Sequence, residues 1–147
     1  GWPTKVWPGE RQVALARLAA GRNVPLVLAW GSKDERRAAE EVAAAVPQAV
    51  LAPDTSIPQL AGLLAAARVL VSGDTGPLHL ALALGTPAVG LFGPVPAERN
   101  GPQGLGYRTL QAPGALWERR DVTRVDMGAI GAEAVWQAAE AVVAERH

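Results

Sequence analysis

The sequence predicts an α/β fold, a Rossmann-like three-layer structure in which a parallel sheet lies between helices. Short apolar runs such as 24–30 and 68–72 alternate with helical segments, and this alternation is typical of β-α-β units with helices of about ten or more residues. Both runs are apolar over several consecutive residues, as in strands that are buried on both faces. A length of 147 residues corresponds to a single domain.

The predicted helices have recognisable ends. Pro8 stands in the first turn of a helix over 8–20, and Gly21 can end that helix. Ser56 can cap a helix over 57–67. Further helices are predicted over 34–46, 77–84 and 131–145.

The predicted strands lie between these helices, at 24–30, 49–52, 68–72, 87–92 and 107–111, with a long loop over 93–106. No apolar strand precedes the first helix. Because a doubly wound sheet normally starts from a central strand, we expect this chain to lack the first strand of its sheet. The edge exposed by that lack would favour self-association.

The composition excludes several classes of partner. Lys and Arg total 14 and Asp and Glu total 14, so the net charge is zero, which argues against nucleic acid as a partner. Cysteine is absent, and the two histidines include the terminal His147, so we expect no metal site. No run of about 18 apolar residues could span a bilayer, and no signal peptide is recognisable. We therefore expect a cytoplasmic domain.

The candidate site follows the strand at 68–72. Two glycines bracket Asp74 and Thr75 there, so the main chain could approach a ligand closely. The free amides and the dipole of the next helix would form an anion site, worth roughly 0.3–2 kcal/mol for a charge. His79 lies in the first turn of that helix. Asp74 accepts hydrogen bonds but does not donate them, so it suits sugar hydroxyls better than phosphate.

Each of these signals also has a purely structural interpretation. The Gly-Asp-Thr-Gly segment could be a tight turn with a capping side chain. His79 alone could be a buried histidine with satisfied hydrogen bonds, and Asp34 or Glu35 could cap a helix or balance its dipole. Lys5 could be a solvated surface charge. Trp30, like Trp7, could simply belong to the core.

Taken together, the segments resemble one known family. SGDTGPLHLALALG at 72–85, followed by TPAVGLFGPVPAERNGP, resembles the carboxyl-terminal half of ADP-heptose:lipopolysaccharide heptosyltransferases, glycosyltransferase family 9, which have the GT-B fold. The family pattern is Asp-Thr-Gly, two residues, His, an Ala-rich turn, then Pro and either Phe-Gly-Pro or Tyr-Gly-Pro. KVWP at 5–8 and LAWG at 28–31 are similar to further family motifs, and the resemblance extends to about residue 110.

The resemblance implies a role for each residue of the glycine-flanked loop. The main-chain amides of Thr75 and Gly76 would hold the diphosphate of the donor, with help from Lys5 and His79. Asp74 would bind hydroxyls of the transferred sugar.

The nucleoside contacts are also implied by the resemblance. Glu35 or its neighbour Asp34 would bind the ribose hydroxyls, and the main chain near Thr55 would meet the adenine edge. Residues 1–147 would then be one donor-binding domain. The amino-terminal acceptor domain, with the catalytic carboxylate base, would be absent from this chain, so the chain alone would be inactive and hold no catalytic residue.

The activity implied by the resemblance is an inverting, metal-independent transfer of heptose from ADP-heptose. The acceptor would be a lipid-linked lipopolysaccharide core at the inner face of the cytoplasmic membrane. One alternative is another GT-B enzyme, such as a UDP- or GDP-sugar transferase or an epimerase, and the preferred nucleotide base would separate the two. A second alternative is a non-catalytic nucleotide-binding module.

Overall fold

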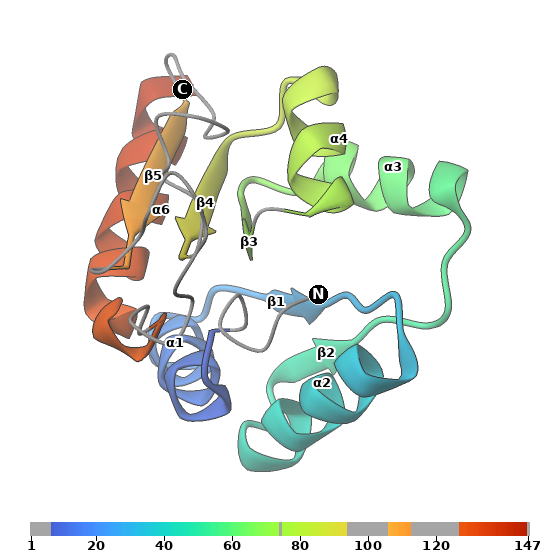
Figure 1. The fold of residues 1–147 in the computed structure, drawn as a ribbon, viewed down its shortest axis with the longest axis vertical. Helices are drawn as coiled ribbons and strands as arrows, with labels where there is room; N and C mark the ends of the chain where they lie inside the picture. Colours follow the sequence, from blue (N-terminus) through green and yellow to red (C-terminus); the bar gives the residue numbers. More distant parts are fainter. Residues whose placement is uncertain (1–6, 74, 94–105, 113–126, 147) are drawn as a thin grey trace, which may run out of the picture.

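The computed structural model describes residues 7–73, 75–93, 106–112 and 127–146 (Figure 1). Each predicted helix and strand is present, with ends that differ by a few residues. In chain order the elements are α1 (Gly9–Gly21), β1 (Leu26–Leu28), α2 (Lys33–Ala45), β2 (Ala49–Leu51), α3 (Ile57–Ala66), β3 (Leu70–Gly73), α4 (Gly76–Leu84), β4 (Ala88–Phe92), β5 (Tyr107–Gln111), the short 3-10 helix η3 (Met127–Ala129) and α6 (Ala132–Arg146).

The first strand is shorter than the predicted 24–30, for a local reason. The amide of Val24 donates to the carbonyl of Ala19 at 2.9 Å, so it closes the end of α1 instead of joining a sheet. Pro25 follows and has no amide to donate. β1 therefore begins at Leu26.

The described strands pair in parallel, as predicted, but they form two sheets instead of one. β1 pairs with β2 in the first sheet, and the second has the order β3-β4-β5. Parallel pairing with helical crossovers confirms the α/β class. The prediction of a single continuous sheet is not met among the described strands, because β1 and β3 do not pair with each other.

The central strand of the second sheet, β4, is covered on both faces, as its apolar sequence predicted, whereas the residues of β3 are half-buried and the prediction of a strand buried on both faces at 68–72 is met only in part. Ala88 and Phe92 pack with Leu78 of α4 on one face of β4. Val89 and Leu91 point to the opposite face and join the main core cluster with residues of α1 and α6. This alternation follows the two-residue period of a strand, and all five residues of β4 are buried.

The first sheet does not match that prediction. Leu26 and Leu28 pack against α1 and α2, but the side chains on the other face remain open, with Val27 44% and Val50 57% exposed. The strand predicted to be buried on both faces is thus buried on one. The other face is uncovered because the two helices α3 and α4 pack elsewhere. α4 packs over β3 and β4, and α3 packs against α4.

Long-range hydrogen bonds join the two ends of the described chain. The indole Nε1 of Trp7 donates to the carbonyl of Ile130 at 2.9 Å, and Nε of Arg11 donates to the carbonyl of Gly128 at 3.0 Å. Trp7 is 7% exposed and belongs to the main core cluster, so its predicted core position is confirmed.

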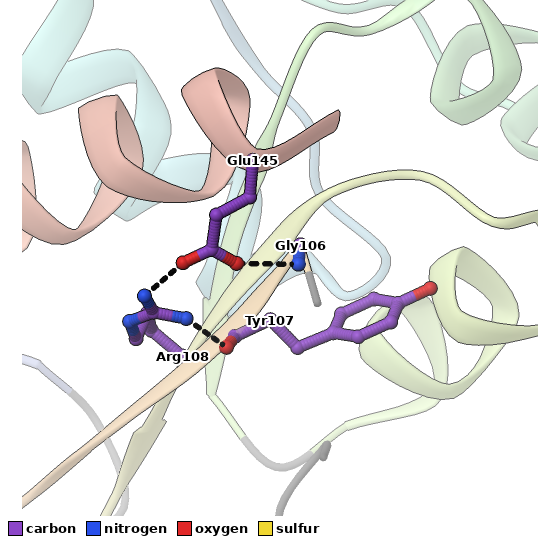
Figure 2. Close-up of polar contacts among 4 residues, drawn as sticks. All are labelled: Gly106, Tyr107, Arg108 and Glu145. Carbon is purple, nitrogen blue, oxygen red and sulfur yellow. Dashed lines mark hydrogen bonds and ion pairs between the residues drawn. The ribbon is translucent and has the colours of Figure 1, made fainter. Parts of the chain in front are cut away.

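A second polar contact ties α6 to the start of β5 (Figure 2). The carboxylate of Glu145 accepts a hydrogen bond from the amide of Gly106 at 2.8 Å and forms an ion pair with Arg108. The Arg108 guanidinium also donates to the carbonyl of Tyr107 at 3.0 Å. The Gly106 amide, and then Arg108, hold the pKa of Glu145 below its usual value. This contact fixes the end of the last helix.

Among the residues described, no helix combines the length and apolar character that crossing a membrane requires.

Candidate functional site

Three helices begin just beyond the carboxyl ends of strands, where ligands bind in folds of this class. Two of these helices, α2 and α3, are capped by side chains at their own amino ends. At α2, the amide of Glu35 donates to Ser32 Oγ at 3.1 Å, and the amide of Ser32 donates to Glu35 Oε1 at 3.2 Å. At α3, Ser56 and Gln59 form the same capping box, with distances of 3.3 and 2.8 Å. The side chains of these residues accept hydrogen bonds from main-chain amides that could otherwise bind an anion.

The amino end of α4 is different. Thr75 occupies the capping position with extended backbone, but its side chain makes no capping bond. Its Oγ1 lies 3.0 Å from the hydroxyl of Ser72 instead. No described group accepts a hydrogen bond from the amides of Thr75 or Gly76. The first turn of α4 therefore retains amides that can bind an anion.

The space above this turn is open. A Cβ atom built on Gly76 would meet no heavy atom within 4 Å, so packing within the protein does not require a glycine there. Thr75, Gly76 and His79 are all exposed, and the structure places them together on the first turn of α4. Exposure excludes the interpretation of His79 as a buried histidine. Asp74 and Lys5, the other two predicted diphosphate and sugar ligands, lie outside the described residues.

The two candidate ribose ligands have different surroundings. Glu35 is a member of the α2 capping box, so its structural interpretation as a capping residue is confirmed. Asp34 is exposed on the same turn, and within the described part of the chain its carboxylate has no partner. Glu35 thus has one carboxylate oxygen engaged in the cap, whereas both oxygens of Asp34 are without a described partner.

Trp30 connects the carboxyl ends of β1 and β2. Its Nε1 donates to the carbonyl of Ala52 at 2.7 Å, and the Arg36 guanidinium lies 5.0 Å from the centre of its ring. Trp30 is half-buried, so it does not belong to the closed core. Thr55, also half-buried, lies on the loop that follows β2. The indole thus joins the end of β1, just before the first turn of α2 that carries Asp34, to the loop after β2 that carries Thr55.

Sequence reasoning did not identify Ser72 as part of the site. Its hydroxyl is near the end of β3 and lies 3.0 Å from the hydroxyl of Thr75, whose side chain makes no capping bond to α4. A hydroxyl residue directly before the Gly-Asp-Thr-Gly segment was the available signal. Among the described residues, no group of three or more His, Cys, Asp or Glu side chains could hold a metal ion.

Comparison with known proteins identifies a family match and solved structures of similar fold. The model of glycosyltransferase family 9 (heptosyltransferase) matches residues 1–126. Lipopolysaccharide heptosyltransferase 1 of Pseudomonas aeruginosa is 42% identical over 93 residues, which are 63% of this chain and 26% of that protein.

Two solved structures from E. coli are similar over almost the whole chain. Heptosyltransferase WaaC with ADP has a TM-score of 0.82 at 29% identity, covering 96% of this chain and 41% of that one. The same enzyme with ADP-2-deoxy-2-fluoro heptose has a TM-score of 0.78 at 29% identity, with 95% and 39% covered. This chain thus spans about two fifths of the solved proteins that it matches. From the family match over residues 1–126, we conclude that the chain belongs to glycosyltransferase family 9, the heptosyltransferases.

Proposed function

We propose that this chain is the donor-binding domain of an inverting glycosyltransferase that moves heptose from ADP-heptose onto a lipopolysaccharide core acceptor. The observation that carries the proposal is the uncapped amino end of α4, which lies inside the segment matched by the family model. The similarity to relatives whose structures contain ADP or a fluorinated ADP-heptose supports the same donor.

In this proposal the diphosphate binds at the first turn of α4. The amides of Thr75 and Gly76 donate to its oxygens, and the helix dipole favours its negative charge. His79, exposed on the same turn, donates a further hydrogen bond, and Lys5 adds a positive charge. These groups would stabilise the charge that develops on ADP as the bond to the sugar breaks. Asp74 would accept hydrogen bonds from the sugar hydroxyls.

The nucleoside lies along the neighbouring loops. Asp34 accepts from the ribose hydroxyls, because the carboxylate of Glu35 is already used in the α2 capping box. The main chain near Thr55 meets the adenine edge. The contact between Trp30 and Ala52 sets the spacing between these two loops.

Other parts of the proposal concern the whole enzyme. The acceptor hydroxyl would be deprotonated by a carboxylate in an amino-terminal domain, and the transfer would need no metal ion. The enzyme would work at the inner face of the cytoplasmic membrane on a lipid-linked acceptor. Two copies could also pair through an exposed sheet edge, for which β1 and β3 each offer one, and light scattering at high concentration would detect such a pair.

Titration of the chain with ADP, GDP and UDP, followed by NMR of main-chain amides, tests the proposal. We expect ADP to shift the amides of Thr75, Gly76 and His79 most strongly, while the amides of α1 serve as the unshifted reference. A preference for UDP or GDP would favour another nucleotide-sugar enzyme of the same fold. If all three nucleotides leave the α4 amides unshifted, also in a chain extended at its amino terminus, the donor-site assignment is wrong.

A further inference from the structure

The hydroxyl of Ser72 links β3 to the capping position of α4. Side chains alternate along a strand, so Ser72 shares the face of Leu70, which packs with Leu78 of α4. In β4 the register partner of Ser72 is Gly90, which has no side chain to crowd the hydroxyl. Ser72 Oγ lies 3.0 Å from Thr75 Oγ1, so a strand residue contacts the residue that begins the helix.

The three helices at the carboxyl ends of the strands differ at the residue three positions before the cap. At α2 and α3 this residue is Ala29 or Pro53, and the capping serine accepts a hydrogen bond from the amide three residues later. At α4 it is Ser72, and Thr75 contacts this hydroxyl instead of the amide of Leu78. The uncapped helix is thus the one of the three with a competing hydroxyl.

The main-chain hydrogen bonds of the first turn differ in the same way. At α2 the carbonyl of Ser32 accepts from the amide of Arg36 at 2.9 Å, and the equivalent bond at α3 has the same length. At α4 the carbonyl of Thr75 accepts from two amides, those of Leu78 at 3.2 Å and His79 at 3.4 Å. The amide of Leu78 therefore lacks the side-chain acceptor that its counterparts in α2 and α3 have.

A side-chain cap on α4 would compete with an anion. Pro77 has no amide, so the residues directly after Thr75 offer only the amides of Gly76 and Leu78. A Thr75 hydroxyl that accepted a hydrogen bond from Leu78 would occupy one of these amides. It would also turn its oxygen lone pairs toward the incoming anion. An uncapped α4 therefore favours anion binding.

We propose that Ser72 is a positioning residue for the diphosphate of the donor, because its hydroxyl binds that of Thr75 and so prevents Thr75 from capping α4. This inference rests on the proposed function, which assigns the diphosphate to the same turn. Ser72 acts through Thr75 and does not itself contact the ligand.

The protons of the two hydroxyls fit this role. The hydroxyl of Ser72 donates to the carbonyl of Gly73 at 3.0 Å. Its lone pairs are then available for the single proton of the Thr75 hydroxyl. The pair holds Thr75 Oγ1 beside β3, away from the amide of Leu78.

Ser72→Ala tests the proposal, with Ser72→Thr as the matched control that keeps the hydroxyl. Hydrogen exchange of the Leu78 amide and isothermal titration with ADP are measured on the same samples. In Ser72→Ala the freed Thr75 should cap α4, so that Leu78 exchanges more slowly and ADP binds more weakly. Each change should be roughly 2- to 30-fold, the size of one helix cap expressed as an equilibrium constant. Ser72→Thr should stay close to the wild type in both measurements. A general loosening of the fold would instead speed the exchange at Leu78.

Thr75→Val tests whether Ser72 acts through Thr75. Valine can neither cap α4 nor bind the Ser72 hydroxyl. Adding Ser72→Ala to Thr75→Val should therefore change neither the exchange at Leu78 nor the ADP affinity further. Ser56→Ala on α3 calibrates the exchange measurement, because removing an existing cap should speed exchange of the Gln59 amide.

Three results would overturn the proposal. The first is an exchange rate at Leu78 that is unchanged or faster in Ser72→Ala. The second is wild-type ADP affinity in Ser72→Ala, which would leave the donor site intact but remove the role of Ser72. The third is a further loss of ADP affinity when Ser72→Ala is added to Thr75→Val, which would make Ser72 a direct ligand. If Leu78 exchange slows in Ser72→Ala but the wild-type chain does not bind ADP, the donor site is wrong and the control of the cap by Ser72 stands.

Discussion

Replacing Gly76 with alanine should separate the effect on ligand binding from the effect on folding. Apart from its chain neighbours and the backbone of α4, the added Cβ would meet no heavy atom of the described residues within 4 Å, and the backbone there is not in the left-handed region. Gly76→Ala should therefore leave the free energy of unfolding unchanged or raise it by about 0.4–1 kcal/mol, through the entropy of the unfolded chain.

The same methyl group should weaken donor binding. A phosphate oxygen must come within about 2.7–3.2 Å of an amide nitrogen to accept its hydrogen bond, and the new Cβ would occupy the space above that turn. Loss of one hydrogen bond to a charged group costs about 1.5–3 kcal/mol. At about 1.4 kcal/mol per tenfold change, ADP should bind roughly 10- to 140-fold more weakly.

Isothermal titration with ADP and urea denaturation measure the two quantities on the same protein. Gly62→Ala on α3 is the matched control, because a Cβ there also meets nothing within 4 Å. It should stabilise the fold by about 0.5–1 kcal/mol and leave ADP affinity unchanged. If Gly76→Ala binds ADP with wild-type affinity, the assignment of the diphosphate to α4 is wrong. If Gly76→Ala strongly lowers the free energy of unfolding, the space beside Gly76 is not open.

Three further predictions follow from other contacts. Thr86→Val removes the hydrogen bond of 2.8 Å to the carbonyl of Leu64 and should lower the free energy of unfolding by about 0.5–1.5 kcal/mol in urea denaturation. An unchanged free energy of unfolding would show that this hydrogen bond does not stabilise the fold. Glu145→Gln should lower stability at neutral pH, because the depressed pKa of Glu145 stabilises the fold above the carboxyl's usual pKa. The difference should shrink as pH falls through the lowered value, and a difference constant from pH 7 to 3 would contradict this. Asp34→Ala should weaken ADP binding without affecting folding, whereas Glu35→Ala should mainly lower thermal stability, because the helix cap is lost. If the two variants change ADP affinity and melting temperature by the same amounts, this division of roles is wrong.

Much of the local structure could be predicted because it depends on residues within one turn or one strand. Ser56 caps α3, as its position before Pro58 indicated. Gly85 ends α4 in the left-handed conformation, with φ of 75°. β4 is buried on both faces, as the apolar run over 87–92 predicted. In each case the deciding neighbours are a few residues away in the sequence.

The candidate site was predictable in its location but not in its details. The Gly-Asp-Thr-Gly segment before a helix indicated an anion site, and the structure places Thr75 and Gly76 on an uncapped turn. The choice between Asp34 and Glu35 stayed open, because both carboxylates stand in the first turn of the same helix. Side-chain geometry distinguishes the two, since one carboxylate oxygen of Glu35 accepts a hydrogen bond from the amide of Ser32, and this difference is the basis on which we propose Asp34.

The sequence by itself determined the α/β class, the order of helices and strands, and the place of the candidate anion site before α4. These features depend on the hydrophobic periodicity, the capping residues and the positions of glycine, which involve residues close together in the sequence. Tertiary structure decided which strands pair, which face of β1 is covered, and how distant segments meet. Trp7 and Ile130 are 123 residues apart, and Glu145 and Gly106 are 39 apart. Such contacts, like the open edges of β1 and β3, depend on how the helices pack across the sheets, which no local pattern encodes.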